Sequence, residues 1–243
     1  MSTTTPTIQI LPGYRPGILG RTLDMHMDFY SPLAGWGVSF ESGLACALGP
    51  LLKRLDGMDV IKDPQKFNKE ATDGEVTPPR GRNQVWSAVQ TQVQDQDQDQ
   101  GNKKKDSERI VGVVYVNGDY YRMGEHKEEG GEEVCRLQCL IVDDEVRGLG
   151  VGRKLFAAAM AFVKEAGFRE CRLTTSRELK AARRLYERGG FVVVEEKNEE
   201  YVRDDDGRKQ VFERMEYVWR RDGSGGDVSE ETQTDTGMEV AVG

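Results

Sequence analysis

The chain has 243 residues, with 34 Lys and Arg against 42 Asp and Glu, and a formal net charge of −8. This balance argues against nucleic acid as the main partner, because binding phosphates requires a clustered basic face. Four cysteines without a C-x-x-C pair and two distant histidines argue against a metal site. The N-terminus lacks signal-peptide features, and no apolar run approaches the ~20 residues that span a membrane. We therefore expect a soluble cytoplasmic protein that binds no membrane, with the nucleus as an alternative compartment.

The first half of the chain predicts two helices and two strands. Residues 1–7 are expected to be flexible, and apolar residues then recur at helical steps from Leu19 to Tyr30. A second helical stretch covers residues 41–55, and strands are predicted at residues 85–89 and 110–116. Between these strands, residues 92–108 contain Q-D-Q-D-Q-D-Q and three lysines. This low-complexity composition predicts a disordered surface insertion.

The second half alternates strands and helices. Strands are predicted at residues 134–142, 171–175, 191–196 and 211–219, and helices at residues 151–166 and 178–188. From residue 222 to residue 243 the chain is rich in Gly, Ser, Thr and acidic residues, which predicts a disordered acidic tail. The alternation predicts an α/β domain over residues 8–221.

A glycine-rich turn joins the strand at 134–142 to the helix at 151–166. A helix N-terminus leaves N–H groups unpaired and favours an anion, and glycines let a phosphate approach the backbone. The turn fits neither the Walker A pattern nor the dinucleotide fingerprint G-x-G-x-x-G. The alternative is that this glycine-rich turn only joins the strand to the helix and binds no ligand. The candidate ligand-binding residues are Arg147, Gly148, Leu149, Gly150, Val151, Gly152 and Arg153.

This turn, R-x-x-G-x-G between a strand and a helix, resembles the coenzyme A pyrophosphate loop of the GNAT N-acetyltransferase superfamily. Residues 182–191, A-R-R-L-Y-E-R-G-G-F, resemble the family's A-x-x-L-Y-x-x-x-G-F pattern at the expected distance downstream. The resemblance implies the GNAT fold, an α/β fold with a mixed, mostly antiparallel central sheet flanked by helices. It also implies acetyl-CoA as co-substrate, no metal, and direct attack of a primary amine on the thioester through a tetrahedral intermediate.

The resemblance also assigns roles to particular residues. It implies that Tyr186 protonates the departing thiolate, which a phenol can do as a general acid; a core tyrosine is the alternative. It implies that the strands at 134–142 and 171–175 splay apart to admit the pantetheine. The position seven residues before Tyr186, often Asn in the family, is Leu179 here. The backbone groups expected to contact the pantetheine are those of Leu140, Ile141 and Val142.

The amino-terminal half resembles the GNAT domains that elsewhere follow a MarR-type winged helix. The matching positions are Gly20, His26, Phe29-Tyr30, Gly35-Trp36-Gly37 and Phe40-Glu41. The residues before Gly20 are too few for a winged helix, so DNA binding is not expected. Helices in this region of GNAT enzymes border the acceptor site, which makes Glu41 and His26 candidates for removing the ammonium proton. The alternatives are that Glu41 is only a charge at the start of a helix and that His26 is only a packed side chain.

The acceptor is expected to be a small-molecule amine or a Lys-containing peptide, and the acidic composition favours a cationic one. The sequence does not specify the acceptor or the oligomeric state. Two other functions compete with acetyl transfer. One is a non-catalytic acyl-CoA-binding or regulatory protein of the same fold. The other is an interaction adaptor that uses the acidic insertion and tail.

Overall fold

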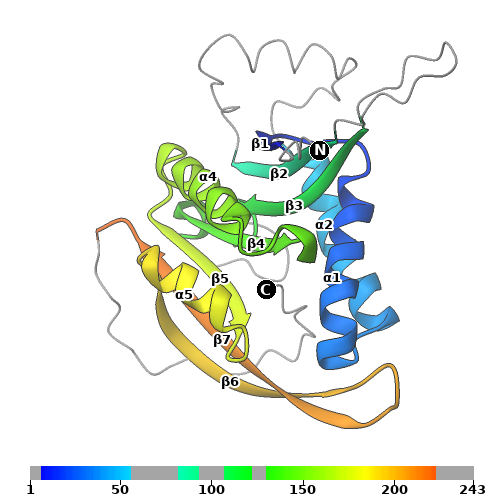
Figure 1. The fold of residues 1–243 in the computed structure, drawn as a ribbon. Coiled ribbons are helices and arrows are strands. Elements are labelled where there is room, and N and C mark those ends of the chain that lie inside the picture. Colours follow the sequence, from blue (N-terminus) through cyan, green and yellow to red (C-terminus); the bar gives the residue numbers. More distant parts are fainter. Residues whose placement is uncertain (1–6, 56–81, 93–106, 122–129, 223–243) are drawn as a thin grey trace, which may run out of the picture.

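The apolar segments of the chain form the strands of one mixed sheet with helices packed on its faces. The structure, a computed structural model, describes residues 7–55, 82–92, 107–121 and 130–222. Within these residues, seven strands follow the order β1-β2-β3-β4-β5-β7-β6 (Figure 1). All neighbouring strands are antiparallel except β4 and β5, which are parallel. The predicted mixed, mostly antiparallel sheet is therefore confirmed.

The strands are β1 (Thr7–Pro12), β2 (Asn83–Gln92), β3 (Ser107–Asn117), β4 (Val134–Val142), β5 (Glu170–Ser176), β6 (Val192–Val202) and β7 (Lys209–Arg220). The helices are α1 (Ile18–Ala34), α2 (Val38–Lys53), α4 (Val151–Glu165) and α5 (Lys180–Arg188), with short turns η2 (Gly131–Glu133) and η3 (Asp144–Val146). The predicted strand at 134–142 and the helix beginning at 151 agree with β4 and α4. Most of the expected insertion, residues 93–106, and the tail from residue 223 lie outside the described residues.

Two hydrophobic cores lie on opposite faces of the sheet. Helices α4 and α5 cover one face, where Leu155 and Phe156 pack with buried strand residues such as Leu173. Helices α1 and α2 cover the other face, where Leu44 and Leu48 pack with buried residues of β2, β3 and β4. Burial of both faces explains the apolar runs in the central strands.

The pairing of β4 with β5 is short. It covers only residues 134–136 of β4 and 170–172 of β5, although β4 continues to residue 142 and β5 to residue 176. On the other side of β4, the register with β3 shifts so that Cys139 and Leu140 stand opposite Val114 alone. Cys139 has a positive φ of 53°, as a bulge residue can adopt. The predicted splay between these two strands is confirmed.

The hairpin of β6 and β7 is longer than the sequence predicted. Strands were expected at residues 191–196 and 211–219 around a charged loop, but β6 continues to Val202 and β7 begins at Lys209. The prediction of a loop was wrong because charged residues suppress the apolar alternation that marks a strand. Here they stabilise the hairpin across its strands: Arg214 on β7 pairs with Glu195 at 3.2 Å and with Glu199 at 3.0 Å on β6.

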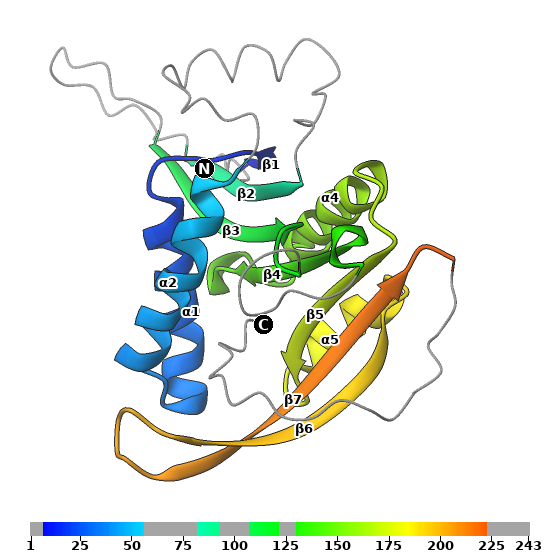
Figure 2. The same cartoon turned by 180° about the vertical axis from the view of Figure 1, so that it is seen from behind.

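The turn of this hairpin contacts the connection between α1 and α2 (Figure 2). The carboxylate of Asp204 accepts hydrogen bonds from the backbone N–H of Gly37 at 2.9 Å and of Ser39 at 3.1 Å. It also accepts from the Ser39 hydroxyl at 2.9 Å. Gly37, the N-cap of α2, has no side chain to cap the helix, so Asp204 provides this cap from a distant part of the sequence.

Candidate functional site

The glycine turn leaves the first N–H groups of α4 accessible to a ligand. Gly148 and Gly150 adopt left-handed φ angles of 80° and 78°, which glycine adopts without strain. Gly150 is the N-cap of α4 and makes no side-chain cap. A Cβ atom added at Gly148 would meet no atom within 4 Å, so space for a ligand adjoins the backbone there. The predicted strand–turn–helix geometry for an anion is present.

A cleft of about 1590 Å³ runs from this turn along the splayed side of β4. Small-ligand sites usually occupy about 300–1,000 Å³, so the cleft has room for an elongated molecule. All ten residues that the sequence predicted for ligand binding line it: Leu140, Ile141, Val142, Arg147, Gly148, Leu149, Gly150, Val151, Gly152 and Arg153. Tyr186 of α5 lies in the wall of the same cleft.

Beyond Arg153, sequence reasoning missed one wall of this cleft. Phe156, Met160 and Lys164 continue from Arg153 along α4 at three- and four-residue steps and form this wall. The same spacing also marks a core-facing helix, so it carried no separate signal for a ligand. Phe29 of α1 lines the cleft from more than a hundred residues away in sequence, and no local pattern pointed to it.

Arg147 contributes to this site through contacts with the protein. Its Nη2 lies 2.6 Å from Asp144 Oδ1, and its Nε donates to the carbonyl of Val142 at 3.3 Å. The guanidinium carbon lies 4.7 Å from the centroid of the Phe29 ring. These contacts join the turn to the end of β4 and to α1, and Arg153 is the other arginine of the turn that faces the cleft.

Tyr186 is held in the cleft wall by packing and by the anchoring of its helix. Its side chain is buried, and its ring lies 5.8 Å from that of Phe156. Burial raises the pKa of Tyr186, and the neighbouring Cys139 and Tyr217 raise it further, so the phenol is protonated at neutral pH. Arg183 Nε donates to the Tyr217 hydroxyl at 3.1 Å, which in turn donates to Glu187 at 3.0 Å. These bonds attach α5 to β7.

His26 and Glu41 do not line the cleft that holds Tyr186 and the glycine turn. His26 is fully buried, and its Nδ1 lies 2.7 Å from the Thr22 carbonyl. Burial lowers the pKa of His26 to about 4, against a smaller opposing effect of that hydrogen bond. Glu41 is exposed in the first turn of α2. Their roles in proton transfer stay predictions.

Within the residues that the structure describes, no group of three or more His, Cys, Asp and Glu side chains could hold a metal ion. None of the described helices is both long and apolar enough to cross a membrane. His126 lies outside the described residues.

Comparison with known proteins bears on this geometry. The model of the acetyltransferase (GNAT) family matches residues 78–191, which include β4, the glycine turn and Tyr186. A solved structure of a candidate acetyltransferase from Acinetobacter baylyi ADP1 is similar, with a TM-score of 0.55, 10% sequence identity and coverage of 91% of this chain and 96% of that one. The chain has the GNAT fold.

Two curated relatives match shorter stretches. An N-acetyltransferase named YjgM of Escherichia coli K12, described as uncharacterized, is 41% identical over 59 residues, which are 24% of this chain and 35% of that protein. A mycothiol acetyltransferase of Geodermatophilus obscurus is 31% identical over 86 residues, 35% of this chain and 26% of that protein. The chain therefore spans only about a third or less of each relative in these matches. The resemblance to MarR-fused GNAT domains stays a prediction.

Proposed function

We propose that this GNAT protein is an N-acetyltransferase that moves an acetyl group from acetyl-CoA to a primary amine. One observation carries the proposal: the same cleft is lined by the glycine turn, by β4 beyond its pairing with β5, and by Tyr186. A phosphate-binding turn alone would fit many ligands. Its connection to a splayed strand and a buried phenol fits a long thioester whose reacting end lies away from its phosphates.

The residues of the cleft fit coenzyme A in three ways. The open space beside Gly148 and the uncapped N-terminus of α4 suit a pyrophosphate. Arg153 and Lys164 on the α4 wall supply positive charge along the cleft. The end of β4 and β5 pairing leaves the β4 backbone near Leu140 available to the amide groups of a pantetheine. Each feature supports acetyl-CoA as co-substrate.

Acetyl-CoA would supply the thioester carbonyl that the amine attacks. The amine nitrogen forms the new C–N bond, the C–S bond breaks, and coenzyme A departs as its thiol. We assign the proton for the thiolate sulfur to the hydroxyl of Tyr186, which burial keeps protonated. Backbone N–H groups near the β4 bulge are suited to stabilise the carbonyl oxygen as it gains charge. Glu41 and His26 remain the sequence-based candidates for the amine proton.

The acceptor that we propose is a primary amine, either on a small molecule or on a lysine of a peptide. The net charge of −8 supports a cationic acceptor, because an acidic protein attracts cations during encounter.

Two measurements test the proposal. Calorimetric titration with coenzyme A should give micromolar binding to the wild type. Gly150→Glu should abolish it, because a carboxylate at this left-handed position adds strain and repels the phosphates. An acceptor panel should then reveal acetyl-CoA-dependent release of free thiol. Wild type that binds no coenzyme A, or Gly150→Glu that binds like wild type, contradicts the cofactor assignment. Binding without turnover on any amine would favour the non-catalytic alternative.

A further inference from the structure

A buried carboxylate lies at the base of the glycine turn. Asp143 follows β4 directly, and its side chain is only 9% exposed. Its Oδ1 accepts the backbone N–H of Glu145 at 3.1 Å, which caps η3, and its own N–H donates to the carbonyl of Val111 at 2.9 Å. Because η3 leads into Arg147 and the glycines, Asp143 fixes the start of the segment that presents the turn.

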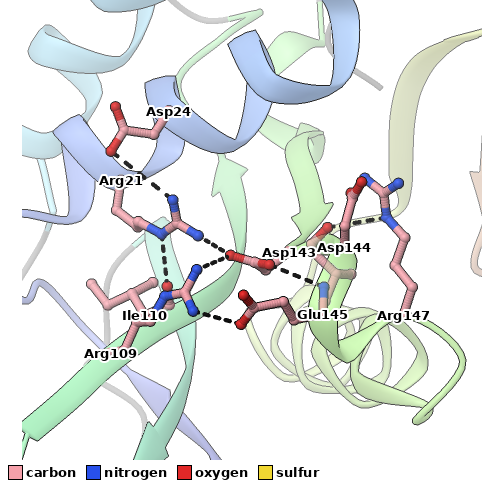
Figure 3. Close-up of polar contacts among 9 residues, drawn as sticks. Arg21, Asp24, Arg109, Ile110, Asp143, Asp144, Glu145 and Arg147 are labelled. Atoms are coloured by element: carbon pink, nitrogen blue, oxygen red, sulfur yellow. Dashed lines mark hydrogen bonds and ion pairs between the residues drawn. The ribbon is translucent and has the colours of Figure 1, made fainter.

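Two arginines from distant parts of the chain converge on the other carboxylate oxygen (Figure 3). Arg21 of α1 and Arg109 of β3 both donate to Oδ2 of Asp143, Arg109 through Nη2 at 2.8 Å. Arg21 Nε also donates to the Ile110 carbonyl at 3.0 Å, and Arg109 Nη1 donates to Glu145 at 2.6 Å. Each guanidinium thus spans two acceptors, which holds α1, β3 and η3 in one geometry.

The same helix contacts the turn at a second point. Phe29 lies two helical turns beyond Arg21 on α1, and its ring is covered by the guanidinium of Arg147. Phe29 and Arg147 both line the cleft, whereas Arg21, Arg109 and Asp143 do not. The turn region is therefore linked to α1 at two points, by Asp143 through Arg21 and by Arg147 through Phe29, which lines the cleft.

We propose that Asp143 is a positioning residue for the coenzyme A pyrophosphate. It orients the N–H groups of the turn through η3 and through the two arginines, without touching the ligand. This inference rests on the proposed function. A direct contact is excluded by charge as well as by location, because a carboxylate beside a pyrophosphate would repel it.

The direction in which replacing Asp143 changes the affinity for coenzyme A separates this role from simple electrostatics. Removing a negative charge near the turn should by itself strengthen the binding of an anionic ligand. If Asp143 positions the turn, its removal should instead weaken binding. Asp143→Asn keeps the size of the side chain and an oxygen for the η3 cap, but it cannot neutralise two guanidinium groups. Asp144→Asn is the matched control, because it removes the same charge from a neighbouring side chain that is 75% exposed.

The experiment is calorimetric titration of the full chain with coenzyme A and with dephospho-coenzyme A. We expect Asp143→Asn to weaken both ligands by about tenfold, since both carry the pyrophosphate. Asp144→Asn should bind at least as tightly as wild type, because it removes a negative charge beside the turn while Arg147 stays held by the Val142 carbonyl and Phe29. Arg109→Lys keeps the charge but loses the bridge between Asp143 and Glu145, so it should weaken binding in the same direction by about threefold. Circular dichroism and thermal unfolding establish that each variant is folded at the titration temperature.

The outcomes separate the two proposals. If wild type binds and Asp143→Asn binds as tightly as Asp144→Asn, the positioning role is wrong and the proposed function stands. If wild type binds no coenzyme A, both are wrong. If Asp143→Asn loses affinity for coenzyme A but not for dephospho-coenzyme A, the pyrophosphate assignment is wrong and the 3′-phosphate is the affected group. If Asp143→Asn does not fold, Arg109→Lys decides, and wild-type affinity in that variant overturns the role.

Discussion

Tyr186 is a single side chain whose chemistry depends on where the fold buries it. Because burial raises its pKa, its hydroxyl stays protonated through neutral and mildly alkaline pH. We expect Tyr186→Phe to bind coenzyme A within about twofold of wild type and to lower kcat by about a hundredfold, the usual size of a lost general acid. Calorimetry and thiol release measure the two effects. Tyr217→Phe removes a neighbouring hydroxyl that anchors α5, and it should lower kcat less than Tyr186→Phe does. Equal losses of kcat would show that the effect comes from packing.

His26 is a residue whose protonation should limit stability in acid. Its folded pKa of about 4 lies below the unfolded value of 6.5, so the unfolded chain binds a proton that the folded chain rejects. The stability linked to neutral His26 is therefore complete above pH 6.5 and is lost as the pH falls toward 4. Between pH 7 and pH 5 this amounts to about 2 kcal/mol.

The test is urea unfolding of wild type and His26→Phe at both pH values. The variant keeps an aromatic ring between Tyr30 and Phe40 but cannot titrate. Its free energy of unfolding should fall about 2 kcal/mol less than that of wild type between pH 7 and pH 5. Parallel losses in the two proteins would contradict the prediction. Unchanged turnover of His26→Phe would also remove His26 as a candidate base.

At the scale of elements, the contact between the β6–β7 hairpin and the start of α2 joins parts of the chain that are far apart in sequence. Hydrogen bonding to Ser39 and Gly37 lowers the pKa of Asp204, so its carboxylate caps α2 throughout the neutral range. Asp204→Ala should lower the free energy of unfolding by about 1 kcal/mol, as for other lost N-caps. It should also speed hydrogen exchange at the Gly37 and Ser39 amides.

Asp205→Ala is the matched control for this contact. Asp205 is the next residue in the same turn, and it pairs with Arg203 at 2.6 Å. Exposed ion pairs of this kind contribute little, so exchange at Gly37 and Ser39 should stay at the wild-type rate. Equal acceleration in both variants would show that the turn is loosened generally and that Asp204 is no specific cap.

Among the elements, those with strong local signals were predicted most closely. The segment from β4 to α4 combines an apolar strand, a glycine turn and an amphipathic helix, and the predicted strand matches β4 residue for residue. The extended hairpin was underestimated because its strands are rich in Glu, Lys and Arg, whose stabilising partners lie on the opposite strand. Cross-strand pairing is a tertiary contact, and composition does not reveal it.

At the scale of the whole molecule, the sequence by itself determined where the glycine turn lies between β4 and α4 and how far along the chain Tyr186 follows it. These features depend on short segments of sequence, because glycine spacing and helix boundaries are set by neighbours along the chain. The tertiary structure alone decided that Asp143 meets Arg21, that Asp204 caps α2, and that His26 is withdrawn from solvent. The first two contacts join residues 122 and at least 165 positions apart. They form only when the sheet brings distant segments together, because burial and charge pairing depend on neighbours in space.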